Sequence, residues 1–292
     1  MPIRRLLACA LGCATIATAA PAAAEPALWA VRDADSTVYL FGTVHALKEA
    51  SWWTPKLEAA LSASQELWVE VGDAADPARM GAEILPVVQK LGLDPTTPLS
   101  TRLTPAERES LASAAAAVGL KPEQLEPMKP WLAALTFSTV PMIRAGYDPN
   151  LGVDTFVAKM AVREGKPVKG FETGEQQLGY LANLPLEAQL EMLRQTLKEI
   201  ASAPQLLDEM AAAWSAGDTA GLERMVDADM KDEGPELYRA LIVRRNQAWA
   251  NAIAERMKGK GISFVAVGAA HLLGPDSVQS LLAARGLTSV RQ

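Results

Sequence analysis

Cysteine is nearly absent from this 292-residue chain, and its two cysteines, Cys9 and Cys13, both lie within the first 24 residues. Those residues have the pattern of an export signal: a basic pair, an apolar run, and small residues before a predicted cut between Ala24 and Glu25. The mature chain, residues 25–292, would then contain no thiol. Disulfides and thiolate metal ligands are excluded there, so stability must come from a hydrophobic core.

Basic runs and long apolar runs are also lacking. The chain has 34 acidic and 28 basic residues, a formal net charge of −6, and removal of Arg4 and Arg5 with the signal would make this about −8. Without a cluster of basic residues, nucleic acid is excluded as a partner. No stretch after residue 24 is apolar enough to span a bilayer. We therefore predict a periplasmic or secreted protein; the sequence does not indicate its oligomeric state.

Hydrophobic runs near both ends predict strands, and the middle of the chain reads as helical. The predicted strands cover 28–31, 37–41, 67–71, 167–171, 262–267 and 288–290. Capping and periodicity predict a helix that begins at 55 and helices at 77–92, 105–118, 130–144, 153–163, 235–257 and 276–285, with two or three more within 174–230. We predict one α/β (α+β-like) domain over 25–292. Its central mixed sheet comes from the N- and C-terminal parts, and a large helical insertion at about 75–260 is interrupted by a strand at 167–172.

Histidine is as rare as cysteine, but its two positions share a pattern. His45 and His271 each follow a hydrophobic strand and a glycine three residues earlier, Gly42 and Gly268. A single histidine at a strand end is most often a structural residue. The repeated pattern favours a functional role for the pair, and the glycines would let the backbone approach a site closely.

Two glutamates stand at comparable places. Glu70 follows Leu67-Trp68-Val69, and Glu172 follows Val168-Lys169-Gly170-Phe171. In α/β sheets, functional groups gather beyond the carboxyl ends of parallel strands. If the four strands are parallel neighbours, both histidines and both glutamates converge. The alternative is that Glu70 is a solvated strand end and that Glu172 serves the next helix.

Such a group of residues is suited to binding a divalent metal ion. His45, His271 and Glu70 are the predicted ligands, with a coordination position left for water, and Glu172 is the predicted general base. The hypothesis requires both imidazoles to lie within roughly 4 Å of a shared point, about twice a metal–nitrogen bond.

Three further residues complete the predicted site. Arg245 lies within an apolar stripe of a predicted helix, formed by Leu237, Leu241, Trp249 and Ile253. A guanidinium in that position would pair with a buried carboxylate or a developing oxyanion. The alternative is that the side chain extends past the stripe to solvent. Asn246 and Asp154 are predicted to bind substrate, although Asp154 also suits the first turn of its helix.

On these residues the chain resembles the TraB/GumN family, which includes the animal Tiki proteins. The resemblance covers about 28–291 and rests on the segments 28–29, 41–45, 67–70, 152–154, 165–173, 245–246 and, most specifically, 267–276. It implies a Tiki-like α/β fold, more remotely related to erythromycin-esterase-like proteins. It also implies an active site formed by the Gly-x-x-His motifs and the glutamates. The implied activity is metal-dependent proteolysis.

The sequence therefore predicts an exported metal-dependent hydrolase that acts on peptides or proteins, with manganese, cobalt or zinc as cofactor. One alternative is a periplasmic protein that binds a metal or a small ligand without catalysis. Another is a metal-free esterase that uses histidine as base. A serine nucleophile of the usual kind is disfavoured because no Gly-x-Ser-x-Gly segment is present.

Overall fold

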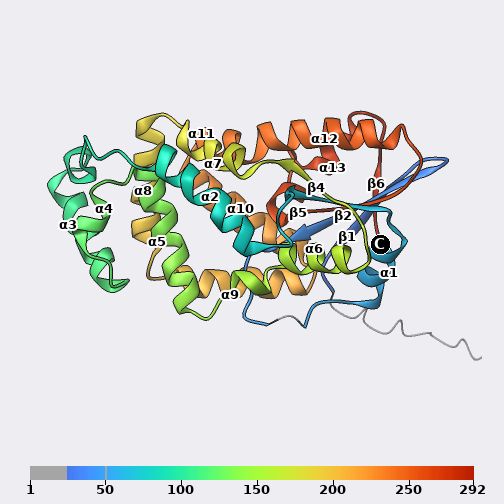
Figure 1. Cartoon of the computed structure of the whole chain (residues 1–292), viewed down its shortest axis with the longest axis horizontal. Helices are drawn as coiled ribbons and strands as arrows, with labels where there is room; N and C mark the ends of the chain where they lie inside the picture. The colour runs from blue at the N-terminus through green and yellow to red at the C-terminus, as the bar shows by residue number, and fades with distance from the viewer. Residues whose placement is uncertain (1–24, 50) are drawn as a thin grey trace, which may run out of the picture.

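A computed structural model describes residues 25–49 and 51–292 (Figure 1). The predicted export signal, residues 1–24, lies outside the described residues. In the described part, six strands form one sheet. The strands are β1 (Leu28–Arg32), β2 (Ser36–Thr43), β3 (Glu66–Val71), β4 (Val168–Glu172), β5 (Gly261–Gly268) and β6 (Ser289–Arg291). The strand order is β4-β3-β5-β2-β1-β6. The four strands β4, β3, β5 and β2 are parallel to one another. Strand β1 pairs antiparallel with both β2 and β6.

Helices make up most of the remaining chain. The α-helices are α1 (Pro55–Ala63), α2 (Pro77–Gly92), α3 (Pro105–Ala117), α4 (Pro122–Leu125), α5 (Pro130–Arg144), α6 (Val153–Arg163), α7 (Gly174–Ala182), α8 (Leu186–Glu199), α9 (Ala203–Ser215), α10 (Thr219–Glu233), α11 (Pro235–Tyr238), α12 (Arg244–Met257) and α13 (Val278–Ala283). Short 3₁₀ turns are η1 (Leu99–Arg102), η2 (Pro149–Leu151) and η4 (Ala269–Leu272), and η3 (Arg239–Val243) is a π-helical turn. Within this part of the chain, no helix is long and apolar enough to cross a membrane.

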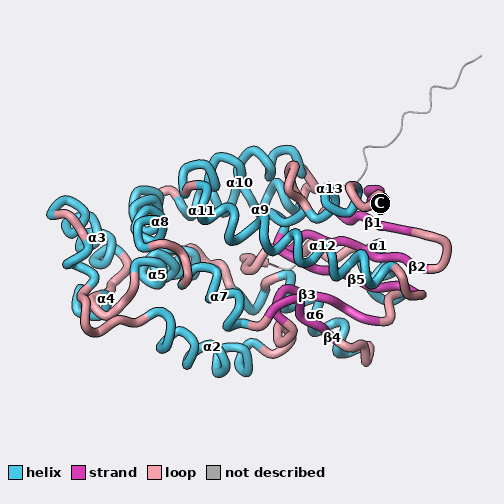
Figure 2. Tube along the Cα trace, turned by 90° about the horizontal axis from the view of Figure 1, so that it is seen from above, coloured by secondary structure: helices cyan, strands magenta, loops and turns pink. Residues whose placement is uncertain are grey.

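The sheet lies between two layers of helices. Successive side chains along a strand point to opposite faces, so each face packs into its own hydrophobic core. Phe264 and Ala266 of β5 belong to the core shared with α1 and α6, whereas Val265 and Val267 pack with α12 and α13 on the other face. This is the mixed α/β architecture that the sequence predicted. A third core joins α3, α5, α7 and α8 in a helical lobe beside the sheet, which Figure 2 shows from above.

Two predictions about the helices need correction. The segment 174–230 holds four helices rather than two or three, because Pro185, Pro204 and Gly217 each mark a helix boundary. The segment 235–257 is not one regular helix, because the π-helical turn η3 separates α11 from α12. That turn ends two residues before the predicted site residue Arg245, and π-turns are frequent at functional sites.

Candidate active site

The carboxyl ends of the four parallel strands bring together the residues that the sequence singled out. Glu70 lies near the end of β3, and Glu172 is the last residue of β4. His45 follows β2 by two residues, and His271 lies in η4, the turn after β5. Since these strands are contiguous in the sheet, the condition for convergence is met.

The shared point lies beside Gly268, the glycine of the second Gly-x-x-His motif. A Cβ atom at Gly268 would lie 3.0 Å from Glu70 Oε1, 3.5 Å from His271 Cδ2 and 3.7 Å from His45 Nε2. The Gly268 N–H itself donates to Glu70 Oε1 at 2.7 Å. Glycine thus leaves open a space that a carboxylate and two imidazoles surround.

The His45 half of the site is exposed and charged. Its Nδ1 lies 2.9 Å from Asp154 Oδ2 at the start of α6, and its side chain is 70% exposed. The other Asp154 oxygen accepts from Thr43 Oγ1 at 2.5 Å. The negative charge of Asp154 and its hydrogen bond raise the pKa of His45 to about 9. His45 is therefore an imidazolium ion at neutral pH.

Local backbone packing holds this pair in place. Gly152 caps α6, and a Cβ atom there would collide with the carbonyl oxygen of His45. The next residue, Val153, donates its N–H to the carbonyl of Val44 at 2.9 Å. The Gly-Val-Asp segment therefore fits directly beneath the histidine loop, and this contact aims Asp154 at His45.

The His271 half is buried and neutral. Its Nδ1 lies 2.6 Å from Asn246 Oδ1, while Asn246 Nδ2 donates to the carbonyls of His271 and Asp276. Because Asn246 Oδ1 is then the acceptor, His271 Nδ1 carries the proton and its Nε2 has a lone pair. That lone pair faces Arg245 Nη1 at 3.1 Å. Burial, aided by the charge of Arg245, lowers the pKa of His271 to about 3.

Arg245 links the two glutamates. Its Nη2 donates to Glu70 Oε2 at 2.6 Å, and its Nε and Nη2 donate to the two oxygens of Glu172 at 2.9 and 3.0 Å. Its Nη1 also donates to the carbonyl of Leu241, in the π-helical turn. The guanidinium packs 4.7 Å from the centre of the Trp249 ring. Arg245 thus has the buried carboxylate partners that its place in an apolar stripe requires.

The two glutamates differ in their electrostatics. Burial alone would raise the pKa of Glu70, but the positive charges around it and the Gly268 N–H lower that pKa to about 2. Burial raises the pKa of Glu172, although its bonds to Arg245 oppose this. Glu70 is therefore an ionised group that faces the shared point, whereas Glu172 is held on the far side of Arg245.

Sequence reasoning missed two donors to these carboxylates. Gln177 of α7 donates its Nε2 to Glu70 Oε2 at 2.9 Å, and Trp249 of α12 donates its Nε1 to Glu172 Oε1 at 3.1 Å. The sequence pattern places Trp249 only in the apolar stripe of its helix. The sole sequence signal for Gln177 is its place in the first turns of the helix that follows Glu172.

The side chains around Gly268, two imidazoles and a carboxylate, are of the types that bind divalent ions. Each histidine has Nδ1 bound by a second side chain, the arrangement typical of metal ligands. The carboxylates of Glu70 and Glu172 face the Arg245 guanidinium, and that of Asp154 faces the charged His45 ring. Among the described residues, however, no three such side chains form a ready metal cluster. Arg245 Nη1 lies against His271 Nε2, so His271 can bind an ion only after this contact opens.

Comparison with known proteins adds a family and one relative. The model of the TraB/PrgY/gumN family matches residues 27–291. A protein of Treponema pallidum (strain Nichols), described as uncharacterized, is 22% identical to this chain over 275 residues, which cover 90% of this chain and 82% of that protein. No solved structure matches the chain.

Proposed function

We propose that this chain, which belongs to the TraB/PrgY/gumN family, is an exported metal-dependent hydrolase that cleaves peptide bonds. The observation that carries this proposal is the shared space beside Gly268. Two imidazoles and an ionised carboxylate lie within 3.7 Å of the position that a Cβ atom would occupy there. Export rests on the sequence pattern of residues 1–24 alone.

The proposed ligands are His45, Glu70 and His271. Because His45 is protonated at neutral pH, an ion would bind its Nε2 by displacing the proton there. A divalent ion bound there would lower the pKa of a bound water and polarise a carbonyl group. Asp154 holds His45 by its Nδ1 and directs Nε2 toward the shared space. Asn246 fixes the protonated nitrogen of His271, which leaves a lone pair on the Nε2 that faces Arg245 Nη1. Asp154 and Asn246 therefore act on the histidines, rather than on substrate as the sequence suggested.

We assign Arg245 and Glu172 to holding the site together. Both Glu172 oxygens accept hydrogen bonds from Arg245, and Trp249 donates to one of them. A carboxylate engaged in this way is a poor proton acceptor for a bound water. Glu172 thus fixes the guanidinium, which in turn fixes Glu70 through Nη2.

The test is a peptide-library digest by the mature protein, residues 25–292, analysed by mass spectrometry. We expect cleavage that a chelator abolishes and that manganese, cobalt or zinc restores. Glu70→Gln should remove at least about 99% of the activity, the usual scale for an essential group. Glu58→Gln, on the exposed face of α1, is the matched control and should leave it unchanged.

A metal-free esterase is a second candidate because of the His45–Asp154 pair. An exposed imidazole whose Nδ1 bonds a carboxylate can serve as a general base. With a pKa of about 9, His45 would be mostly protonated at neutral pH, so this activity should rise as the pH approaches 9. Chelator-resistant ester hydrolysis with that profile would replace the metal-dependent proposal. Absence of any turnover, with tight binding of a metal or small ligand, would favour a binding protein.

A further inference from the structure

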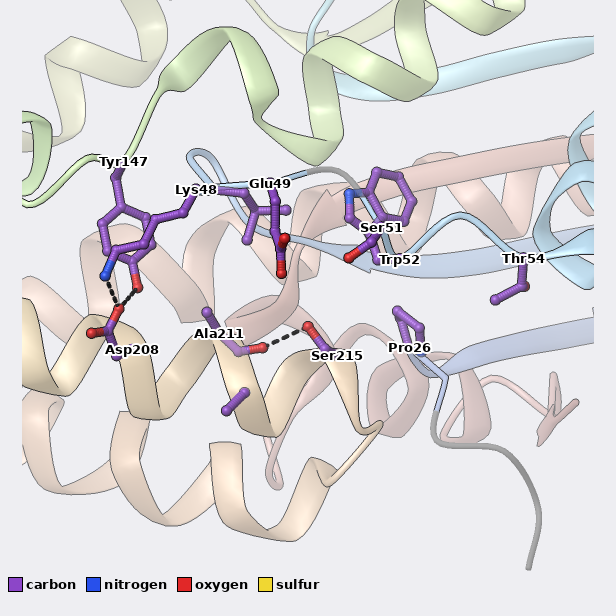
Figure 3. Close-up of a pocket in the computed structure, with 12 residues that line it drawn as sticks. Pro26, Lys48, Glu49, Ser51, Trp52, Thr54, Tyr147, Asp208, Ala211 and Ser215 are labelled. Carbon is purple, nitrogen blue, oxygen red and sulfur yellow. Dashed lines mark hydrogen bonds and ion pairs between the residues drawn. The ribbon is translucent and has the colours of Figure 1, made fainter.

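A separate cavity of about 330 Å³ lies between the loop that follows His45 and helix α9 (Figure 3). None of the residues around the shared space at Gly268 lines it. Its walls combine an indole ring with charged and small apolar side chains. We call it the Trp52 cavity, after the largest side chain that lines it.

The charge in the Trp52 cavity is predominantly negative. Lys48 is already paired, since its Nζ lies 2.5 Å from Asp208 Oδ1, and Tyr147 donates its hydroxyl to the same oxygen at 2.7 Å. Within the described residues, neither Asp208 Oδ2 nor the Glu49 carboxylate has a hydrogen-bond partner. Figure 3 shows the Glu49 side chain extending toward α9. The cavity therefore offers two free acceptors to a positive group.

A buried donor without a partner also lines the cavity. Trp52 is only 6% exposed, and its Nε1 makes no hydrogen bond within the described residues. In Figure 3 the indole nitrogen lies on the side of the ring turned toward Glu49. An unpaired buried N–H is costly, so this position favours a ligand that supplies an acceptor oxygen.

We propose that the Trp52 cavity binds a lysine or arginine residue of a peptide. The charged head would lie between Glu49 and Asp208, and the methylene stem would contact Leu47, Ala211 and Ala212, which also line the cavity. The backbone carbonyl of the peptide would accept from Trp52 Nε1 after a small turn of the indole ring toward the cavity, because that nitrogen is fully buried. As a statement about the substrate, this inference rests on the proposed hydrolase function. As a statement about binding, it can be tested without any turnover.

The test compares three capped amino acids in calorimetric titrations at millimolar concentration, with chelator present to prevent hydrolysis. The probes are N-acetyl-lysine methylamide, the norleucine analogue, which has the same stem without the charge, and the glutamate analogue. We expect the lysine probe to bind at least about ten-fold more tightly than the norleucine probe, as an unpaired carboxylate would favour a cation. Glu49→Gln should remove most of this preference. Glu58→Gln, an exposed glutamate outside the cavity, should preserve it.

Equal binding of the lysine and norleucine probes would overturn the inference, as would preference for the glutamate probe, failure of every probe to bind, or an unchanged preference in Glu49→Gln. The His45→Ala variant separates this inference from the proposed function. It should lose hydrolysis and keep the lysine preference. If the wild-type protein cleaves no peptide but retains that preference, the hydrolase proposal fails and the binding inference stands.

Discussion

His45 and His271 have the same local setting: each follows a parallel strand and a glycine three residues earlier, and each has its Nδ1 bonded to an Asp or Asn side chain. Their environments are nevertheless opposite. His45 is 70% exposed and bonded to a carboxylate, whereas His271 is 5% exposed and bonded to an amide. The pKa of His45 is raised to about 9, and that of His271 is lowered to about 3.

This difference separates two contributions to the site. The Gly-x-x-His pattern after a strand places an imidazole at the shared space. The partner on a distant helix, together with burial, decides whether that imidazole carries a charge. At neutral pH the protein therefore presents one imidazolium and one neutral imidazole across the same glycine. Substitutions at the partners, at Arg245 and at the two glycines probe this asymmetry separately.

The largest expected effect is that of Arg245→Met, which leaves two buried carboxylates without their cation. Removal of one partner from a buried ion pair costs about 3–5 kcal/mol, and we expect a loss of this size in guanidinium chloride unfolding at pH 7. Arg239→Met is the matched control. It removes an exposed arginine paired with Glu236 and should cost less than about 0.5 kcal/mol. Equal losses in the two variants would show that Arg245 does not hold the site together.

The same comparison has a pH dependence. The pKa of Glu70 is lowered from 4.5 to about 2, so its contribution to stability is present above pH 4.5 and is lost as the pH falls through 2. Arg245→Met removes a charge that lowers this pKa. The difference in unfolding free energy between wild type and variant should therefore narrow between pH 4.5 and 2.

The second prediction exchanges the partners of the histidines. Asp154→Asn should lower the pKa of His45 from about 9 toward its ordinary value of 6.5, and Asn246→Asp should raise that of His271 from about 3, each by more than about one unit. Because the chain has two histidines, NMR titration of their ring protons measures both directly. If neither partner substitution moves either pKa, the partners do not set the asymmetry.

A stability measurement checks the His45 half independently. Since its folded pKa is raised, the stabilisation by Asp154 is fully present below pH 6.5 and is lost as the pH rises through about 9. The stability difference between wild type and Asp154→Asn should shrink over that range.

The last prediction distinguishes the two motif glycines. A Cβ atom at Gly42 would lie 3.1 Å from the Ala269 backbone, so Gly42→Ala should cost about 1–3 kcal/mol of stability. A Cβ atom at Gly268 would contact side chains rather than backbone, so Gly268→Ala should cost less than about 1 kcal/mol of stability. It should weaken metal binding at least ten-fold, because the added methyl group occupies the shared space. Calorimetric unfolding and manganese titration measure the two effects. Undiminished metal binding in Gly268→Ala would place the ion elsewhere.

Most of the fold followed from local patterns in the sequence. The strand segments, the Thr104 capping box and the helix containing Arg245 all depend on periodicity or capping, which act over a few residues. The sequence analysis predicts only two or three of the four helices within 174–230, although Pro185, Pro204 and Gly217 mark their boundaries. The π-helical turn before Arg245 has no comparable local signal.

The sequence by itself determined which side chains stand at the carboxyl ends of the strands, and that Arg245 lies within an apolar stripe of its helix, because strand and helix periodicities are local. Only the tertiary structure decided that Asp154 bonds His45 across 109 residues and that Asn246 bonds His271. Those pairings arise from the packing of α6 and α12 against the sheet. The charge of each histidine depends on its partner and its burial, so it was decided only when these distant segments came together.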